Sequence, residues 1–383
     1  MQFTTNRDDF AKALAAAGGA IASRATLPIL SHVLLGTDEE GCFVQATDMD
    51  IEIVRPFAAK VVEGGAVAAP ARILSDIVKR MPAGASIAVS TVNNRLKVVC
   101  GKSRFELNYL PAEDYPELEI KTGQVWTFEI EAEAVRELLG GVRHAIADDE
   151  ARYYLNGVYL HAVGEEACHL IAAATNGHML MQATAAAPPL CQGMPGVILP
   201  KKTVGEILKL LPSGDDLVTM KVCDRLVVLE LAGGVTLASK LIDGTYPDYA
   251  RVIPLSNPHR AVVAADVLAS AIARVATLCE KGDTGVVVFF KPGGPITVSI
   301  DRAGVGSGQD KVPATVDGAR AAIGFNHRYF ATMLGALAGG TIELRYGTAA
   351  DAVLMRLEGE ETVTGVLMPM RANVDAKQLD EAA

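Results

Sequence analysis

Only a few side chains in this sequence of 383 residues are spaced for chemistry. Asp48 and Asp50 lie two positions apart in ATDMDIEI, so on a strand they would share one face and could exchange a proton. An exposed end of a strand is the simpler interpretation. Cys168 and His169 are neighbours, which would point to opposite faces of a strand, so they predict no metal site. The sequence contains no P-loop, GxSxG or HExxH motif. We therefore expect a protein that is not an enzyme and holds neither metal nor cofactor.

Basic side chains form a second pattern, which could bind an anion. They recur in three windows that read as short helices, at 72–81, 201–211 and 324–338. Others lie in the first helix expected in each repeat, or just after it. The residues are Lys12, Arg24, Arg72, Lys79, Arg80, Arg136, Arg143, Lys201, Lys202, Lys209, Arg274, His327 and Arg328. Because the formal net charge of the chain is −10, they would form a local basic face on an acidic body. Such a face meets phosphate oxygens without reading bases. The alternative is that these side chains only solvate the outer faces of their helices.

The helical windows also share an apolar stripe. In window 199–212, apolar residues from Val204 to Leu211 follow the i, i+3, i+4, i+7 spacing of an amphipathic helix, which Pro200 would open. The same stripe begins at Leu74 and at Phe330, at intervals of about 130 residues. The Tyr-Pro pairs at 115–116 and 246–247 are separated by the same interval. These coincidences predict a threefold internal repeat.

The repeat divides the chain into three similar domains, at 1–122, 123–254 and 255–371, followed by a polar tail at 372–383. Each domain reads as helix, strands, helix, strands, which predicts two helices packed on antiparallel sheet in an α+β fold. In the first domain Asp8 or Asp9 would cap the first helix. The strands expected there are 32–36, 42–47, 51–57, 87–90, 95–100 and 103–109.

Composition bounds the cellular setting. Half of the residues (50%) are hydrophobic, which is enough to build sizeable cores. The six cysteines are scattered without CxxC pairing, as is typical of free thiols in a reducing compartment. No apolar run reaches the ~18 residues of a membrane span, and the first residues lack a signal-peptide pattern. We therefore expect a cytoplasmic protein without membrane contact.

Seven segments carry a resemblance to a known family. They are RATLPIL (24–30), ATDMDIEI (46–53), RFELNYLPAEDYPEL (104–118), ARYYLNGVYL (151–160), ATNGHML (174–180), LIDGTYPDYARVIP (241–254) and VLMPMR (366–371). Together they resemble the bacterial DNA polymerase III beta subunit, the sliding clamp family. They occur in order across all three repeats and cover essentially the whole chain before the tail.

The resemblance implies a DNA clamp fold, in which two subunits join head to tail as a ring and helices line a hole for duplex DNA. Such a ring tethers a polymerase and so raises its effective concentration at the primer end. The expected partners are double-stranded DNA of any sequence, a second copy of the chain, DNA polymerase subunits, the clamp loader and other replication and repair proteins. The residues expected to face DNA are Arg24, Arg72, Lys79, Tyr153, Lys201 and Lys202. Those expected at the subunit interface are Phe105 and Leu107 on one subunit and Thr277 and Leu278 on the other.

The resemblance also implies one pocket for partner peptides, between domains two and three. The matching positions are Arg152, Tyr154, Leu155, Thr175, Gly177, His178, Leu180, Pro247, Arg251, Val252, Val366, Met368, Pro369, Met370 and Arg371. Apolar side chains of this kind can form an adaptable cleft, and the arginines could orient polar atoms at its rim. The alternative for the apolar members is ordinary interdomain core.

Three departures from the family pattern bear on partners and DNA. Met179 stands where arginine is usual, Asp149 stands where a DNA-facing glutamine is typical, and the chain continues past Arg371. The segment Lys377-Gln378-Leu379-Asp380 resembles the start of the peptide motif that binds these clamps, so a docked tail and a disordered acidic end are both open. Two other functions remain as alternatives: a clamp-like protein that no longer encircles DNA, and a metabolic enzyme of three repeats with a carboxylate site.

Overall fold

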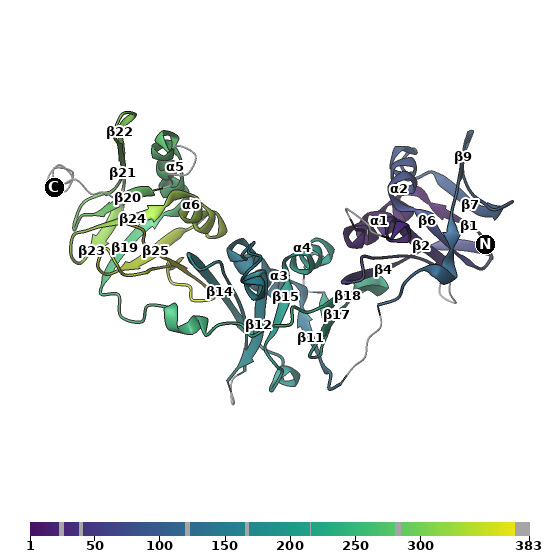
Figure 1. Cartoon of the computed structure of the whole chain (residues 1–383), viewed down its shortest axis with the longest axis horizontal. Coiled ribbons are helices and arrows are strands. Elements are labelled where there is room, and N and C mark those ends of the chain that lie inside the picture. Colours follow the sequence, from purple (N-terminus) through teal and green to yellow (C-terminus); the bar gives the residue numbers. More distant parts are fainter. Residues whose placement is uncertain are drawn as a thin grey trace. The chain divides into compact units, whose positions relative to one another are not determined.

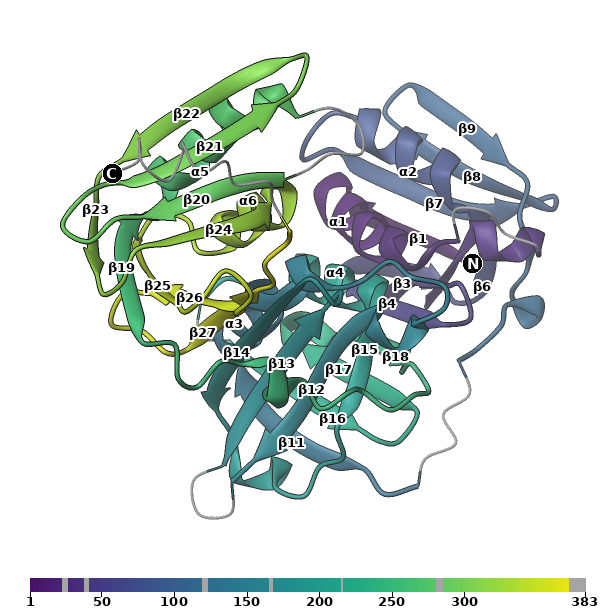
Figure 2. The ribbon, with the colours of Figure 1, turned by 60° about the vertical axis from the view of Figure 1, so that its left-hand side comes forward.

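The computed structural model describes residues 1–22, 27–37, 41–118, 123–164, 168–214, 216–279 and 285–371. Arg24 and the tail at 372–383 therefore lie outside the described residues. The chain folds into two compact units. The first comprises 1–134, 188–195 and 202–241, and the second comprises the rest of the chain. Each unit contains one nine-stranded antiparallel sheet and one smaller sheet. Figures 1 and 2 label these elements.

The helices are short, and each follows a strand. They are α1 (Arg7–Ala17), α2 (Ala71–Arg80), α3 (Ala132–Val142), α4 (Lys201–Leu210), α5 (Ala265–Val275) and α6 (His327–Ala336). The two helices α1 and α2 pack side by side in the first unit, and α5 and α6 do so in the second. The described helices and sheets thus have the predicted α+β composition.

The first unit contains a five-stranded and a nine-stranded sheet. The five-stranded sheet runs in the order β5 (Ala59–Glu63), β1 (Gln2–Asn6), β7 (Ser86–Val92), β8 (Arg95–Cys100) and β9 (Ser103–Leu107). The nine-stranded sheet runs β10 (Leu110–Pro111), β6 (Ala66–Pro70), β2 (His32–Thr37), β3 (Cys42–Thr47), β4 (Ile51–Phe57), β18 (Val235–Lys240), β17 (Leu226–Leu231), β16 (Leu217–Val222) and β11 (Trp126–Glu131). Because β4 pairs with β18, this sheet crosses the predicted limit at 122/123.

The second unit repeats this plan. Its nine-stranded sheet runs β15 (Val197–Pro200), β12 (Gly157–Val163), β13 (His169–Thr175), β14 (Met179–Ala186), β27 (Val363–Leu367), β26 (Val353–Leu357), β25 (Thr341–Tyr346), β19 (His259–Ala264) and β23 (Ala314–Asp317). The four-stranded sheet runs β22 (Gly306–Val312), β21 (Ile296–Arg302), β20 (Gly285–Phe290) and β24 (Ala321–Asn326). Here β14 pairs with β27, so this sheet crosses the limit at 254/255.

The helix stripes form the cores under the sheets. Leu74 and Val78 of α2 are fully buried. Met333 and Leu334 of α6 are at most 1% exposed. Aromatic rings join helix to sheet in the first unit, where Phe10 stacks on Phe57 with 5.1 Å between ring centroids. Full burial of such side chains contributes about 1.5–3 kcal/mol each relative to exposure. The stripes seen in the sequence are therefore core-forming surfaces.

Two predicted helix starts are wrong. The cap of α1 is Asn6, whose Oδ1 accepts a hydrogen bond from the backbone N–H of Asp8 at 2.8 Å. Asp8 and Asp9 lie in the first helical turn instead, where carboxylates suit the positive end of the helix dipole. Pro200 is the last residue of β15 and pairs with Gly157, so α4 begins one residue later, at Lys201. Among the described residues, none of the helices has the length and apolarity to cross a membrane.

Candidate functional site

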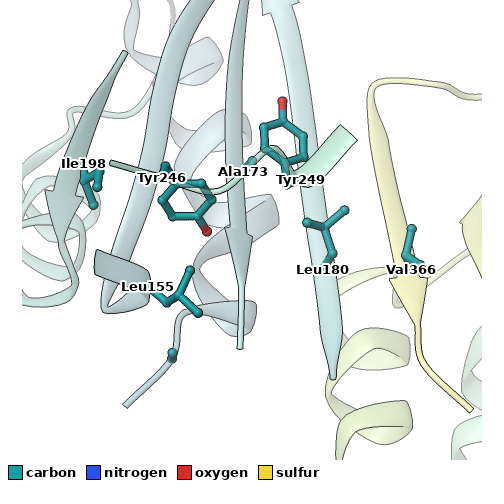
Figure 3. Packing of buried hydrophobic residues seen from close by; sticks show 8 residues of the cluster. Leu155, Ala173, Leu180, Ile198, Tyr246, Tyr249 and Val366 are labelled. Carbon is teal, nitrogen blue, oxygen red and sulfur yellow. The ribbon is translucent and has the colours of Figure 1, made fainter. Parts of the chain in front are cut away.

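A cavity of about 320 Å³ lies in the second unit, where β14 meets β27. Its wall is mostly apolar, and Figure 3 labels four of the lining residues, Leu155, Leu180, Val366 and Tyr249, within the hydrophobic cluster that they help to form. The lining residues are Arg152, Tyr154, Leu155, Thr175, Gly177, Met179, Leu180, Pro247, Asp248, Tyr249, Val252, Val366 and Met368. They come from segments as far apart as 152 and 368, which the sheet brings to one place.

Most residues that the resemblance assigned to a pocket line this cavity, but five do not. His178, Arg251, Pro369, Met370 and Arg371 are absent from its wall. The His178 ring stacks on Tyr329 instead, with 5.3 Å between centroids. The backbone N–H of Met370 donates to Gly324 O at 2.9 Å, which ties the end of the described chain to β24.

Three lining residues were not predicted for the pocket: Met179, Asp248 and Tyr249. Met179 begins β14 and is 5% exposed, so its side chain completes the apolar wall. Asp248 and Tyr249 lie in the same YPDYARV run as the predicted Pro247 and Val252. Proximity in the sequence to predicted residues was the signal that could have identified them.

Aromatic rings pack in the hydrophobic cluster that adjoins the cavity wall. Tyr159 stacks on Tyr246 with 4.9 Å between centroids and 2° between ring planes. The Tyr246 hydroxyl accepts a hydrogen bond from the backbone N–H of Thr175 at 3.1 Å. His161 Nε2 and the Tyr249 hydroxyl share a hydrogen bond of 2.9 Å. Burial raises the pKa of Tyr249 to about 12 and lowers the pKa of His161, so both groups are uncharged at neutral pH. The aromatic cluster beside the cavity is therefore held by stacking and hydrogen bonds, and its Tyr249 and His161 are neutral.

Two arginines at or beside the cavity pair with aspartates: Arg152 lines the cavity, and Arg251 contacts Asp248, which lines it. Arg152 Nε donates to Asp149 Oδ2 at 2.9 Å, and Arg251 Nε lies 2.7 Å from Asp248 Oδ2. The backbone N–H of Arg152, followed by its guanidinium, holds the pKa of Asp149 below its usual value. The Asp149 side chain is thus used within its own loop, as a turn acceptor and as the partner of Arg152.

Gly177 is required by the conformation of the turn between β13 and β14. Its φ is +88°, a left-handed conformation that favours glycine. A Cβ at this position would lie 2.8 Å from Arg152 Nη1, so the guanidinium packs directly on the glycine. Asn176 Oδ1 accepts hydrogen bonds from the backbone N–H groups of His178 and Met179, at 2.9 and 3.0 Å. One tight turn therefore positions both Arg152 and the wall of the cavity.

The residues predicted to face DNA are exposed where the structure describes them. Arg72 and Lys79 are on the outer face of α2, Lys201 and Lys202 open α4, and Tyr153 is 52% exposed. The α4 lysines form ion pairs: Lys202 Nζ lies 2.5 Å from Asp48 Oδ2, and Lys201 Nζ lies 3.4 Å from Asp148 Oδ2.

Asp48 and Asp50 do not share a strand face, so the paired-carboxylate geometry considered from the sequence is wrong. They lie in the turn between β3 and β4, whose central residue Met49 has a φ of +77°. Asp48 Oδ1 accepts from the backbone N–H groups of Asp50 and Ile51, at 3.0 and 2.9 Å. Asp50 Oδ1 lies 3.1 Å from Lys240 Nζ. In the part of the chain that the structure describes, no cluster of three or more His, Cys, Asp or Glu could hold a metal ion.

The residues predicted for a subunit interface are exposed or half-buried, on an edge strand and in a turn. Phe105 is 38% exposed on β9, an edge strand of the five-stranded sheet. It lines a second cavity, of about 350 Å³, with Ile73 and Arg80 of α2. In the second unit, Thr277 is exposed and Leu278 is half-buried in a 3₁₀ turn (Ala276–Leu278) that follows α5.

Comparisons with known proteins identify the family. The family models for the N-terminal, central and C-terminal domains of the DNA polymerase III beta subunit match residues 1–119, 129–248 and 250–371. A beta sliding clamp of Caulobacter vibrioides is 36% identical over 97% of this chain and 100% of its own length. That of Escherichia coli is 31% identical over the same shares.

Solved structures agree with the sequence comparisons. A sliding clamp (DNA polymerase III subunit beta) from Bartonella birtlesii, solved bound to griselimycin, matches with a TM-score of 0.92 at 35% identity, over 97% of this chain and 100% of that one. The Caulobacter crescentus clamp matches with a TM-score of 0.89 at 35% identity, over the same shares. The fold, the domain matches and the full-length relatives lead to one conclusion: the chain belongs to the DNA polymerase III beta subunit family and acts as a processivity clamp in DNA replication.

Proposed function

We propose that the chain confers processivity by encircling duplex DNA and tethering the replicative polymerase, without catalysis or a cofactor. The observation that supports this most directly is the set of exposed cations on α2 and α4, in a chain whose net charge is −10. Arg72, Lys79, Lys201 and Lys202, with Tyr153, form the proposed DNA face, and Arg24 belongs to it by resemblance. Contacts of this kind are independent of sequence and weaken with salt.

Retention on DNA tests encirclement directly. The protein is loaded onto nicked circular DNA and followed by gel filtration before and after a restriction enzyme linearises the circle. A ring stays on the circle at moderate salt and leaves through the ends once they exist. Equal retention on both forms would favour the clamp-like alternative that does not encircle DNA. A protein that binds neither form would lack the proposed function altogether.

We further propose that the ring is a head-to-tail homodimer. The edge strand β9, with Phe105 and Leu107, would meet the turn of Thr277 and Leu278 on a second copy, and a two-fold axis would repeat the contact. Replacing Leu278 by Asp would bury an unpaired charge in that contact, which typically costs several kcal/mol. We expect Leu278→Asp to be monomeric at micromolar concentration by analytical ultracentrifugation. Ala331→Asp, on an exposed position of α6, is the control and should stay dimeric.

The cavity in the second unit is proposed to bind short peptides of DNA polymerase subunits, the clamp loader and other replication and repair proteins. Its mostly apolar wall, which includes Leu155, Leu180 and the neutral Tyr249, suits an apolar anchor side chain. Met368 lines the cavity and is 41% exposed, so Met368→Ala should remove contact area and cost about 1–3 kcal/mol of peptide binding. Val305→Ala, at an exposed position of the turn between β21 and β22, is the matched control, and Met370→Ala tests whether that residue also belongs to the pocket, as the resemblance implies. Loss of polymerase binding with loader binding untouched would contradict a shared pocket.

We place the protein in the cytoplasm, on DNA. None of the six cysteines forms a disulfide, as is usual in a reducing compartment.

A further inference from the structure

The two basic helices of the first unit differ in how their cations are used. On α4, Lys202 is held by Asp48 and Lys209 by Glu206, whose Oε1 lies 2.7 Å from the Lys209 ammonium. On α2, the side chains of Arg72, Lys79 and Arg80 form no ion pair with any residue in the described ranges. The cations of α2 therefore keep their full charge toward solvent, whereas those of α4 are largely neutralised within the protein.

The negative charge of Asp48 is not needed by the turn in which it lies. The equivalent turn between β13 and β14 has Asn176 in the same role. Asp48 Oδ1 accepts from the N–H groups two and three residues later, and Asn176 Oδ1 does the same at nearly identical distances. An amide oxygen therefore satisfies this turn as well as a carboxylate does. The second oxygen of Asp48 is the one that contacts Lys202.

The environment of Asp48 keeps its charge in place. Only 17% of its side chain is exposed, whereas 42% of the Lys202 side chain is exposed. Burial favours protonation, but hydrogen bonds from Lys202 and from the backbone N–H groups of Ile51 and Asp50 outweigh it and leave the pKa of Asp48 below its usual value. The carboxylate is consequently ionised at neutral pH. A phosphate that approaches Lys202 must displace this carboxylate or bind beside it.

We propose that Asp48 and Asp148 act as internal competitors of DNA phosphate, because they hold Lys202 and Lys201 in ion pairs and so weaken the grip of α4 on DNA. This inference rests on the proposed function and concerns the regulation of the same face. Without the two carboxylates, both lysines would bind phosphate and release counterions. With them, the cations of α2 supply most of the attraction. Exposed ion pairs are individually weak, so the competition reduces the grip without abolishing it.

The test compares Asp48→Asn with the parent in equilibrium binding to a fluorescent open-ended duplex, over a range of salt concentrations. Asparagine keeps the acceptor that the turn needs, as Asn176 shows, so the fold should be retained. One additional phosphate contact should steepen the slope of log affinity against log salt concentration by about 0.9. For each fourfold reduction in salt, the affinity of the variant should then rise by about 3-fold more than that of the parent. Asp148→Asn should give a smaller gain, because its carboxylate is 93% exposed and its contact with Lys201 is longer.

Two further variants show where any gain comes from. Glu230→Gln removes a carboxylate that pairs with Lys221 between β16 and β17, outside the proposed face, and so adds the same net charge elsewhere. It should change neither the affinity nor the salt slope. Adding Lys202→Met to Asp48→Asn should remove the gain. A gain that persists without Lys202, or one that Glu230→Gln reproduces, would overturn the inference.

The inference and the proposed function fail in different ways. Arg72→Glu combined with Lys79→Glu should weaken DNA binding strongly if the basic face exists. If that double variant binds as the parent does, the proposed face is wrong and the inference falls with it. If the double variant loses binding while Asp48→Asn gains none, the face stands and only the competition is excluded.

Discussion

The turns β3–β4 and β13–β14 share one backbone design but carry different side chains. Each begins with threonine, has an Asp or Asn acceptor next, and places a left-handed residue in the middle. Each turn also bonds to the segment that neighbours it in the sheet. The N–H of Lys240, in β18, donates to Asp50 O at 2.8 Å, and the N–H of Met368, just after β27, donates to His178 O at 2.9 Å. The repeat seen in the sequence is therefore also a repeat of hydrogen bonds.

The two turns differ in the side chains that the strand pairs beside them carry. In the β14–β27 pair, Leu180 lies opposite Val366, and both line the apolar cavity. At the equivalent place in the β4–β18 pair, Glu52 lies opposite Ala238. The Glu52 carboxylate accepts hydrogen bonds from Gln45 Nε2 and the backbone N–H of Leu118. The same backbone arrangement thus carries an apolar cavity wall in one unit and a hydrogen-bonded carboxylate in the other.

Copying the polar residue into the apolar unit should have the largest effect. Leu180→Glu would bury a carboxylate without the donors that Glu52 has. We expect a loss of about 3–5 kcal/mol in unfolding free energy and no measurable peptide binding. Leu180→Met nearly conserves volume and should cost less than about 1.5 kcal/mol. Urea denaturation and peptide titration measure both effects. Peptide binding by a folded Leu180→Glu protein would show that the cavity is not the docking site.

Changing the central residue of each turn should have a moderate effect on stability. Gly177→Ala forces a side chain into a left-handed conformation and against the Arg152 guanidinium, so we expect it to cost about 1–2 kcal/mol of unfolding free energy. Met49→Gly relieves the corresponding conformation at φ +77° and should be neutral or stabilising by up to about 1 kcal/mol. Thermal denaturation of the two variants gives the comparison. If both variants lost stability to the same extent, the assigned role of the left-handed conformation would be contradicted.

The smallest effect is a difference in pH dependence. Burial raises the pKa of Glu52, against the opposing hydrogen bonds from Leu118 and Gln45, so the folded protein favours the protonated carboxyl. The stability that Glu52 contributes to the fold is therefore fully present below the pKa of the unfolded state. It is lost as the pH rises through the raised pKa of the folded state. The parent should lose stability relative to Glu52→Gln as pH rises from about 4 toward neutrality. Exposed Glu113→Gln is the control, and parallel pH profiles for the parent and Glu52→Gln would exclude the effect.

Elements with strong apolar alternation were predicted closely. The expected strands 42–47, 51–57 and 95–100 coincide with β3, β4 and β8, because residues such as Ile51 and Ile53 alternate with polar ones. The edge strand β22, with the sequence GSGQDKV, was missed because it lacks β-branched alternation and owes its conformation to pairing with β21. The strand expected at 103–109 ends earlier, at Leu107, because the chain leaves β8 there and pairs with β6 from Leu110 onward.

The candidate site was predicted less completely than the fold. Apolar positions such as Leu155 and Leu180 were recovered through the family resemblance, since residue type alone does not separate a cavity wall from ordinary core. The Lys202–Asp48 ion pair joins residues 154 positions apart, so no local pattern could indicate it. His178 and Met370, which the resemblance assigns to the pocket, are not among the residues that line the cavity, and the structure shows the His178 ring stacked on Tyr329 and the Met370 N–H donating to Gly324 O.

The pairing of β4 with β18 limits how modular the repeats can be. A fragment cut at the predicted limit 122/123 would leave β4 with a row of unpaired N–H and C=O groups, which is a template for aggregation. The partner strand lies more than a hundred residues further along the chain, so a ribosome must complete most of the second repeat before the first can close its sheet. Although the three repeats resemble one another, they would not be interchangeable as separately folding parts, and a gene fusion or truncation would be tolerated only where it preserves both nine-stranded sheets.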